Sequence, residues 1–151
     1  MFQVMSYNNK LTIAKILVSF ALTAYVLLPP LVDFGVSHIA SEHWTPHSRL
    51  HLAWTLYGQI LALPIMLWAI WGRKLHGTGR SVRLMAYIGI AFTLGFFIAG
   101  GLSAKLGADY HDPGHERLIF GMDTNLVMNG TILVLLLLGV FLSIRRGGDA
   151  K

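Results

Sequence analysis

The chain has 151 residues, of which 54% are hydrophobic and only 13% are charged, whereas charged residues make up about a quarter of a typical soluble domain. This composition argues against a soluble protein and indicates an integral membrane protein. The sequence has no cysteine, which excludes disulfides, thiolate metal ligands and iron–sulfur clusters.

Four apolar stretches are long enough to cross a membrane as helices, because about 20 helical residues span a hydrocarbon core about 30 Å thick. The second predicted helix has a clear start signal, with Thr45 as N-cap and Pro46 in the first helical position. Asp112 and Pro113 repeat that signal before the last helix. The expected helices cover residues 11–32, 46–71, 82–104 and 113–144. They predict a single domain, residues 1–151, with an all-α, four-transmembrane-helix fold.

Basic residues are unevenly distributed between the predicted connections. Most lie on the N-terminal segment, the second connection and the C-terminal segment: Lys10, Arg73, Lys74, Arg80, Arg83, Arg145, Arg146 and Lys151. By the positive-inside rule, both termini are then cytoplasmic, and the first and third connections face the extracytoplasmic side. The net charge of +5 is explained by this topology and by contact with anionic lipid head groups, without a nucleic-acid partner.

Titratable side chains gather on the predicted outward side. The stretch "HIASEHWTPHSRLH", residues 38–51, is rich in histidine, and His111 and His115 lie in the third connection. His76 is the one histidine, and Asp149 the one acidic residue, expected on the cytoplasmic side. Two segments far apart in the sequence are therefore expected to meet at one membrane face.

Histidine spacing within this face indicates a metal site. His47 and His51 are four residues apart on one helical face, and Trp54 continues the same stripe. His38, Glu42 and His115 are candidates to complete the ligand set. Nitrogen and oxygen ligands suit a divalent transition metal such as zinc, iron or copper. Arg49 is expected to form ion pairs with the neighbouring acids.

Polar residues also fall inside the predicted helices, where an ionisable group costs about 2.5 to 3.5 kcal/mol on insertion scales. Asp123 is expected about two turns into the fourth helix, with Asn125 close to it and Glu116 in the first turn. Glu116, Asp123, Asn125 and Trp54 are therefore candidate catalytic residues. Glycines of the third helix, among them Gly89 and Gly95, are expected to permit close approach of a neighbouring helix.

Three functions fit these features. The first is a metal-dependent membrane enzyme that acts on a small lipophilic substrate, with His47 and His51 as the central ligands. The second is a metal-free isomerase or cyclase, in which histidine and carboxylate groups move protons and Trp54 stabilises a carbocation. The third is an accessory subunit of a larger membrane complex, or a homo-oligomer, in which the histidines bond across helix ends.

The histidine-rich stretch resembles the signature H-I-x(4)-W-x-P-H-(A/S)-(R/K)-x-H of a family of uncharacterised small four-helix membrane proteins. The matching residues are His38, Ile39, Trp44, Pro46, His47, Ser48, Arg49 and His51. This resemblance implies a four-helix membrane fold and a site at the same residues, and it implies no particular reaction. In architecture the chain is also similar to emopamil-binding-type sterol isomerases and sigma-2-receptor-like proteins.

Overall fold

The computed structural model describes residues 5–35, 38–72, 78–110 and 118–144. Its long helices are α1 (Tyr7–Asp33), α2 (Pro46–Trp71), α3 (Gly79–Gly101) and α5 (Thr124–Leu142), and its short elements are α4 (Ser103–Leu106), β1 (Leu118–Ile119) and β2 (Met122–Asp123). Within the described residues, four helices are long and apolar enough to cross a membrane. The prediction of a mostly helical fold with four membrane-length helices is thus confirmed, and a short β-hairpin is added to it.

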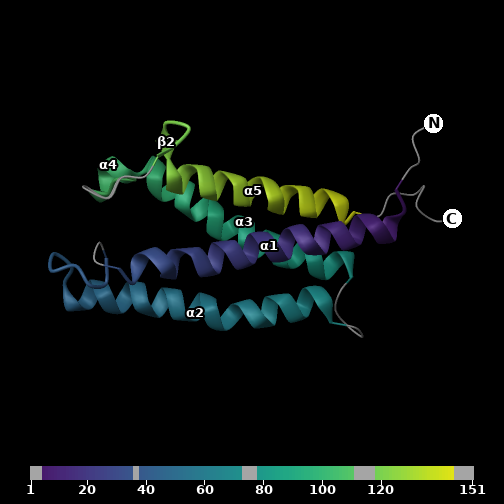
Figure 1. Cartoon of the computed structure of the whole chain (residues 1–151), viewed down its shortest axis with the longest axis horizontal. Coiled ribbons are helices and arrows are strands. Elements are labelled where there is room, and N and C mark those ends of the chain that lie inside the picture. The colour runs from purple at the N-terminus through teal and green to yellow at the C-terminus, as the bar shows by residue number, and fades with distance from the viewer. Residues whose placement is uncertain (1–4, 36–37, 73–77, 111–117, 145–151) are drawn as a thin grey trace.

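The four long helices pack side by side with alternating direction (Figure 1). α1 and α3 form the middle of the bundle, and each contacts all the other long helices. α2 and α5 lie on opposite sides and make no contact with each other in the described parts of the chain. The buried core between the helices is aliphatic and includes Val18, Leu22, Val26, Ile70, Val82 and Leu136. Much of the apolar surface of α2 and α5 therefore faces outward, as expected of helices that contact lipid.

Glycines set the spacing between the central helices. A Cβ atom at Gly89 of α3 would lie 2.8 Å from Cδ2 of Leu22 and 3.0 Å from Cδ1 of Leu136. Gly89 therefore lets α3 approach α1 and α5 together. Gly139 of α5 packs against Val18 of α1 in the same way. Gly95, which the sequence grouped with Gly89, has no neighbouring atom within 4 Å of a Cβ among the described residues. Close approach is thus confirmed at Gly89 and not at Gly95.

The two ends of the bundle carry different parts of the chain. The described residues between α1 and α2, together with α4, β1 and β2, lie at one end, which we call the connection end (Figure 1). The first turn of α1, the first turn of α3 and the last turn of α5 lie at the other end, which we call the terminus end. There, the Tyr7 hydroxyl and Nη1 of Arg83 both donate to the carbonyl oxygen of Ser143, at 3.4 and 2.8 Å. These bonds tie α1, α3 and α5 together at the terminus end.

Hydroxyl side chains fix where the first three long helices begin. Ser6 caps α1, Thr45 caps α2 and Thr78 caps α3, each accepting a hydrogen bond from a backbone N–H three residues later at 3.1 to 3.4 Å. α1 and α3 therefore begin at Tyr7 and Gly79, before the apolar stretches from which they were predicted. α2 occupies the range expected for it, because its cap was recognised in the sequence.

The last helix differs most from expectation. It was predicted over 113–144, but residues 118–123 form an antiparallel hairpin in which Ile119 pairs with Met122, and α5 begins only at Thr124. The hairpin turns at Phe120 and Gly121, whose φ angles are 53° and 77°. Positive φ at both central residues is the geometry of a tight hairpin turn, and it is incompatible with a helix. Residues 113–117 lie outside the described residues.

Candidate functional site

His47 and His51 form a close pair at the start of α2. Because Thr45 and Pro46 fix the start of the helix, the two histidines lie one turn apart on one helical face. Their Nε2 atoms are 3.0 Å apart, and the ring planes are nearly perpendicular, at 84°. Both side chains are exposed. The pair is therefore accessible at the connection end.

This geometry permits two proton arrangements. When one ring carries a proton on Nε2, that N–H donates a hydrogen bond to the other Nε2. When both Nε2 atoms are unprotonated, their lone pairs are available to one metal ion. Tetrahedral zinc with Zn–N bonds of about 2.0–2.1 Å holds two ligand nitrogens about 3.3 Å apart. The observed separation of 3.0 Å therefore needs only a small side-chain movement to hold a metal.

Trp54 extends the pair along the outer surface of α2. The rings of His51 and Trp54 have centroids 5.5 Å apart and are tilted by 31°. Trp54 is 65% exposed, so its indole lies on the outside of the bundle. The stripe expected from the sequence is thus present, and it faces outward from α2. A molecule that meets Trp54 approaches from outside the bundle.

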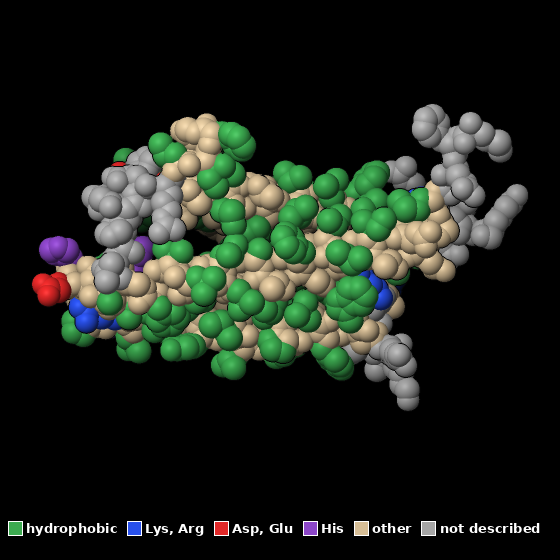
Figure 2. Space-filling model, in the orientation of Figure 1, with side chains coloured by type: hydrophobic (Ala, Val, Ile, Leu, Met, Phe, Trp, Pro, Cys, Tyr) green, Lys and Arg blue, Asp and Glu red, His purple; other side chains and the backbone are tan. Residues whose placement is uncertain are grey.

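A second histidine, His38, belongs to a separate group in the first connection. Its Nδ1 lies 3.9 Å from Oδ1 of Asp33, at the end of α1. Its ring packs edge-on against Trp44, with centroids 5.2 Å apart. Glu42 and His43 follow as exposed residues of the same connection, and Figure 2 shows acidic and histidine side chains at this end of the molecule. His38 therefore has an acidic partner of its own.

The expected set of metal ligands is not assembled in the described residues. Across residues 5–35, 38–72, 78–110 and 118–144, no group of three or more histidine, aspartate or glutamate side chains could hold a metal ion. The prediction of a histidine-rich site joining His38, Glu42, His47 and His51 is therefore corrected: His47 and His51 pair, and His38 pairs with Asp33. His115 and Glu116, predicted as a ligand and a catalytic residue, lie outside the described residues.

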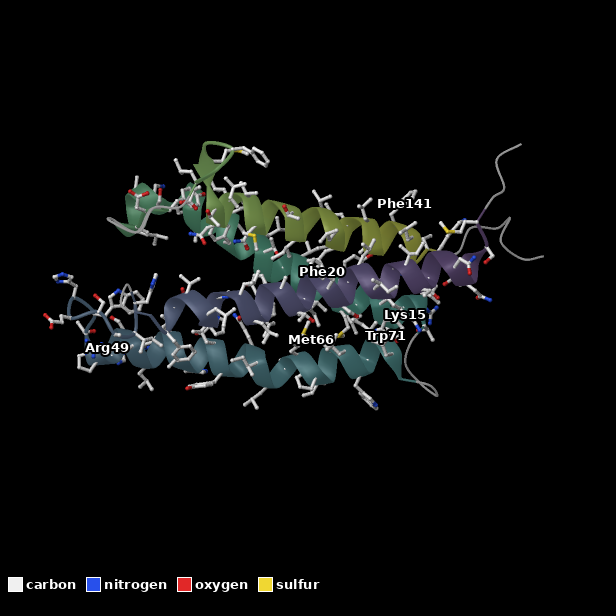
Figure 3. All side chains as sticks on the ribbon, viewed as in Figure 1. Lys15, Phe20, Arg49, Met66, Trp71 and Phe141 are labelled. Carbon is white, nitrogen blue, oxygen red and sulfur yellow. The ribbon has the colours of Figure 1, made fainter. Side chains whose placement is uncertain are left out.

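Arg49 holds the first connection against the start of α2. Its Nη2 donates a hydrogen bond of 2.6 Å to the carbonyl oxygen of Ser41. Its Nε is buried and finds no acceptor in the described parts of the chain. Figure 3 shows Arg49 at the connection end of α2. Arg49 was expected to pair with the neighbouring acids. It instead binds the backbone carbonyl of Ser41, the residue before Glu42.

Asp123 and Asn125 lie at the beginning of α5. Asp123 is only 6% exposed, and its Oδ1 accepts a 2.7 Å hydrogen bond from the backbone N–H of Asn125. Asp123 is therefore the N-cap of α5, and the expectation that it lies two turns inside a helix is wrong. The Asn125 side chain is exposed. Deeper in the bundle, buried Thr93 donates to the carbonyl oxygen of Gly89 at 2.8 Å, so its hydroxyl is satisfied within α3.

The capping role of Asp123 predicts different results for two substitutions. Asp123→Ala removes the acceptor of the Asn125 N–H and should lower the free energy of unfolding by about 0.5–2 kcal/mol. Asp123→Asn keeps a side-chain oxygen and should stay within a few tenths of a kcal/mol of the wild type, since Asn and Asp are comparable N-caps. Unfolding of the detergent-solubilised protein, followed by circular dichroism, measures both. Equal losses in the two variants would show that the carboxylate charge, and not the cap, is what the fold requires.

The geometry thus offers one exposed histidine pair and one histidine–aspartate pair at the same end of the bundle. The resemblance of residues 38–51 to a family of small membrane proteins stays a prediction. Comparisons of the chain with protein-family models, with curated proteins and with solved structures found no match.

Proposed function

We propose that this chain is an integral membrane protein that binds a divalent transition metal through His47 and His51. The single observation that carries the proposal is the 3.0 Å separation of the two Nε2 atoms on an exposed helical turn. Two imidazoles one turn apart are a recurrent metal-binding arrangement on helices. The absence of cysteine from the sequence favours zinc, iron or copper in a nitrogen and oxygen environment.

The proposed topology sets both termini in the cytoplasm and the histidine pair on the extracytoplasmic side. The charge distribution supports this assignment. Arg80 and Arg83 lie at the terminus end, and the sequence adds further basic residues before Thr78 and after Ile144. Basic residues near the ends of membrane helices are retained on the cytoplasmic side. The connection end, which carries His47 and His51, then faces outward.

Two imidazoles leave further coordination positions on the metal. Water, the substrate or the predicted ligand His115 would fill these positions. A metal bound in this way supplies a Lewis acid or an activated water molecule. The open ligand set favours a catalytic site over a closed structural one.

The proposed reaction class is the conversion of a small lipophilic substrate that arrives through the bilayer. Support comes from the outward position of the pair and from its neighbour Trp54, which is exposed on the same side of α2. Hydrophobic side chains cover the surface of the bundle between its two ends (Figure 2). A lipophilic molecule that moves along α2 therefore meets Trp54 before it reaches the histidine pair.

A second candidate function, a metal-free isomerase or cyclase, is favoured by the other pair. His38 and Asp33, with Nδ1 and Oδ1 3.9 Å apart, are a histidine and a carboxylate within reach of proton exchange through small movements. The ring of Trp44 lies against His38 and provides an aromatic face for a cationic intermediate. In this function His38 and Asp33 carry the protons, and His47 and His51 take no part.

A metal titration of the purified protein tests the first proposal. Chelator-treated wild type should bind one equivalent of Zn²⁺ or Cu²⁺, and His47→Ala or His51→Ala should weaken binding at least about tenfold, because each removes one of two protein ligands. Acidification should release the metal, since imidazole binds it only when unprotonated. The matched control is His43→Ala, an exposed histidine of the first connection, which should bind as the wild type does. A wild type that binds no metal, or an equal loss in His43→Ala, would contradict the proposal.

A further inference from the structure

A cavity of about 340 Å³ is lined by residues of the terminus end, whereas the histidine pair lies at the connection end. It lies between the first turns of α1 and α3 and the end of α5. Its lining consists of Tyr7, Thr78, Gly79, Arg80, Arg83 and Ile144. Two arginines therefore share one open cavity with a tyrosine and a threonine, which is a donor-rich lining for a ligand.

Arg83 is held in position by the helices around it. Its Nη1 donates to the carbonyl oxygen of Ser143 at 2.8 Å, and the Tyr7 hydroxyl donates to the same oxygen at 3.4 Å. A guanidinium has five N–H donors in a rigid fork, and this bond uses one nitrogen. Arg80 is exposed and lies three residues before Arg83, so both lie on the same face of α3. The two guanidinium groups thus approach the cavity from one side.

Charge is segregated between the two ends of the bundle. The described acidic residues, Asp33, Glu42, Asp109 and Asp123, all belong to the connection end. The described basic residues of the terminus end are Lys10, Lys15, Arg80 and Arg83. The part of the chain that the structure describes therefore offers no carboxylate at the terminus end to neutralise the two arginines. Among the described residues, the two arginines are therefore left to pair with an anionic ligand.

Aromatic and basic side chains mark the membrane boundary close to this cavity. Nζ of Lys15 lies 5.4 Å from the centre of the Trp71 ring, and Nε1 of Trp71 donates to Oγ of Ser19 at 2.9 Å (Figure 3). Tryptophan and lysine at the end of a membrane helix are typical of the head-group layer. α1, which carries Lys15 and Ser19, also lines the cavity through Tyr7 in its first turn, so we expect the cavity to open toward the head-group layer.

We propose that this cavity binds the phosphate of an anionic phospholipid head group. Arginine pairs with phosphate through two parallel N–H donors, which explains the use of Arg80 and Arg83. A lipid fits better than a soluble phosphate, because its acyl chains lie along the apolar outer faces of the helices. The site is independent of the histidine pair, so neither proposal depends on the other.

Binding of a fluorescent phosphatidylglycerol to the full chain in uncharged detergent micelles tests the site, with phosphatidylcholine as the lipid without net charge. The wild type should bind phosphatidylglycerol at least tenfold more tightly. Arg80→Gln should weaken this binding severalfold, and Arg80→Gln/Arg83→Gln should abolish the preference. The double variant loses the bond from Arg83 to Ser143 and could unfold for that reason. Arg80 is exposed, so the single variant Arg80→Gln should fold normally and still tests the site. Lys105→Gln, an exposed residue of the connection end, removes the same charge and should leave binding unchanged.

Three results would overturn the proposal. Equal affinity for the two lipids, or equal weakening in Lys105→Gln and Arg80→Gln, would show that no specific site exists at this cavity. Displacement of the lipid by millimolar inorganic phosphate, with the same sensitivity to Arg80→Gln, would assign the cavity to a soluble phosphate in place of a lipid.

Discussion

A single cysteine at Glu42 should react with a membrane-impermeant thiol reagent in intact cells, whereas a cysteine at Asn8 should react only after permeabilisation. The wild-type chain has no cysteine, so each variant carries one reactive thiol on an unreactive background. Both positions are exposed and lie at opposite ends of the bundle. This result is expected because basic residues are in excess at the terminus end, and the positive-inside rule assigns such an end to the cytoplasm. Gel-shift labelling of bacterial cells that express the two variants measures the labelled fraction of each. In intact cells, Glu42→Cys should be almost fully labelled and Asn8→Cys almost unlabelled.

Lys105→Cys provides the matched control for this labelling. Lys105 is exposed and belongs to the segment after α3, at the same end as Glu42. It should therefore react from outside, although it is remote from Glu42 in the sequence. If only Asn8→Cys were labelled in intact cells, the orientation would be the opposite of the proposed one, with the histidine pair on the cytoplasmic side. Labelling of all three variants in intact cells would contradict a single orientation.

The parts of the fold that follow local rules were predictable from the sequence. Long apolar stretches gave the number of membrane-length helices, because a helix is the structure that satisfies its own backbone in lipid. Thr45 and Pro46 gave the start of α2, since a hydroxyl cap followed by proline is a specific signal. The pairing of His47 with His51 follows from the four-residue spacing on a helix that begins at that cap.

The start of the last helix was not predictable from hydropathy. The stretch "LIFGM" is apolar like the start of a membrane helix, so its composition does not distinguish a hairpin from a helical turn. The distinguishing signal is Gly121, which together with Phe120 adopts positive φ. Asp112 with Pro113 and Asp123 with Thr124 are competing start signals, and the structure uses Asp123 as the cap of α5. That choice changes Asp123 from a residue inside the bundle to one at its end.

The surroundings of the candidate site depend on packing that sequence periodicity does not report. α2 is apolar on all sides, so its sequence does not show which face packs against α1 and α3. The exposure of Trp54 on the outer side of α2 was therefore not predictable from the sequence. Arg80 and Arg83 were interpreted as a topology signal and as part of a basic excess that contacts anionic lipid head groups, without a specific binding site. Their three-residue spacing indicates a shared face, but the cavity between them and Tyr7 forms because the first turn of α1 and the end of α5 lie beside the first turn of α3.

Gly89→Leu should strongly destabilise the packing of α3 against α1 and α5. An added Cβ would already lie 2.8 Å from Leu22 and 3.0 Å from Leu136, so a whole leucine side chain has no room between α1, α3 and α5. Overpacking a well-packed core costs about 1–3 kcal/mol and occasionally more, and close packing of small residues is what drives helix association within lipid. Thermal unfolding of the detergent-solubilised protein should therefore shift to clearly lower temperature.

Gly95→Leu is the matched control on the same helix. Gly95 is exposed, and a Cβ there meets no atom within 4 Å in the described portion of the chain. Leucine also has a higher helix propensity than glycine, by roughly 0.8 kcal/mol per residue. Gly95→Leu should therefore unfold at the wild-type temperature or slightly above it. If both variants lost stability equally, the loss would come from glycine flexibility within α3, and the tight contact of α3 with α1 and α5 at Gly89 would not be what holds the bundle together.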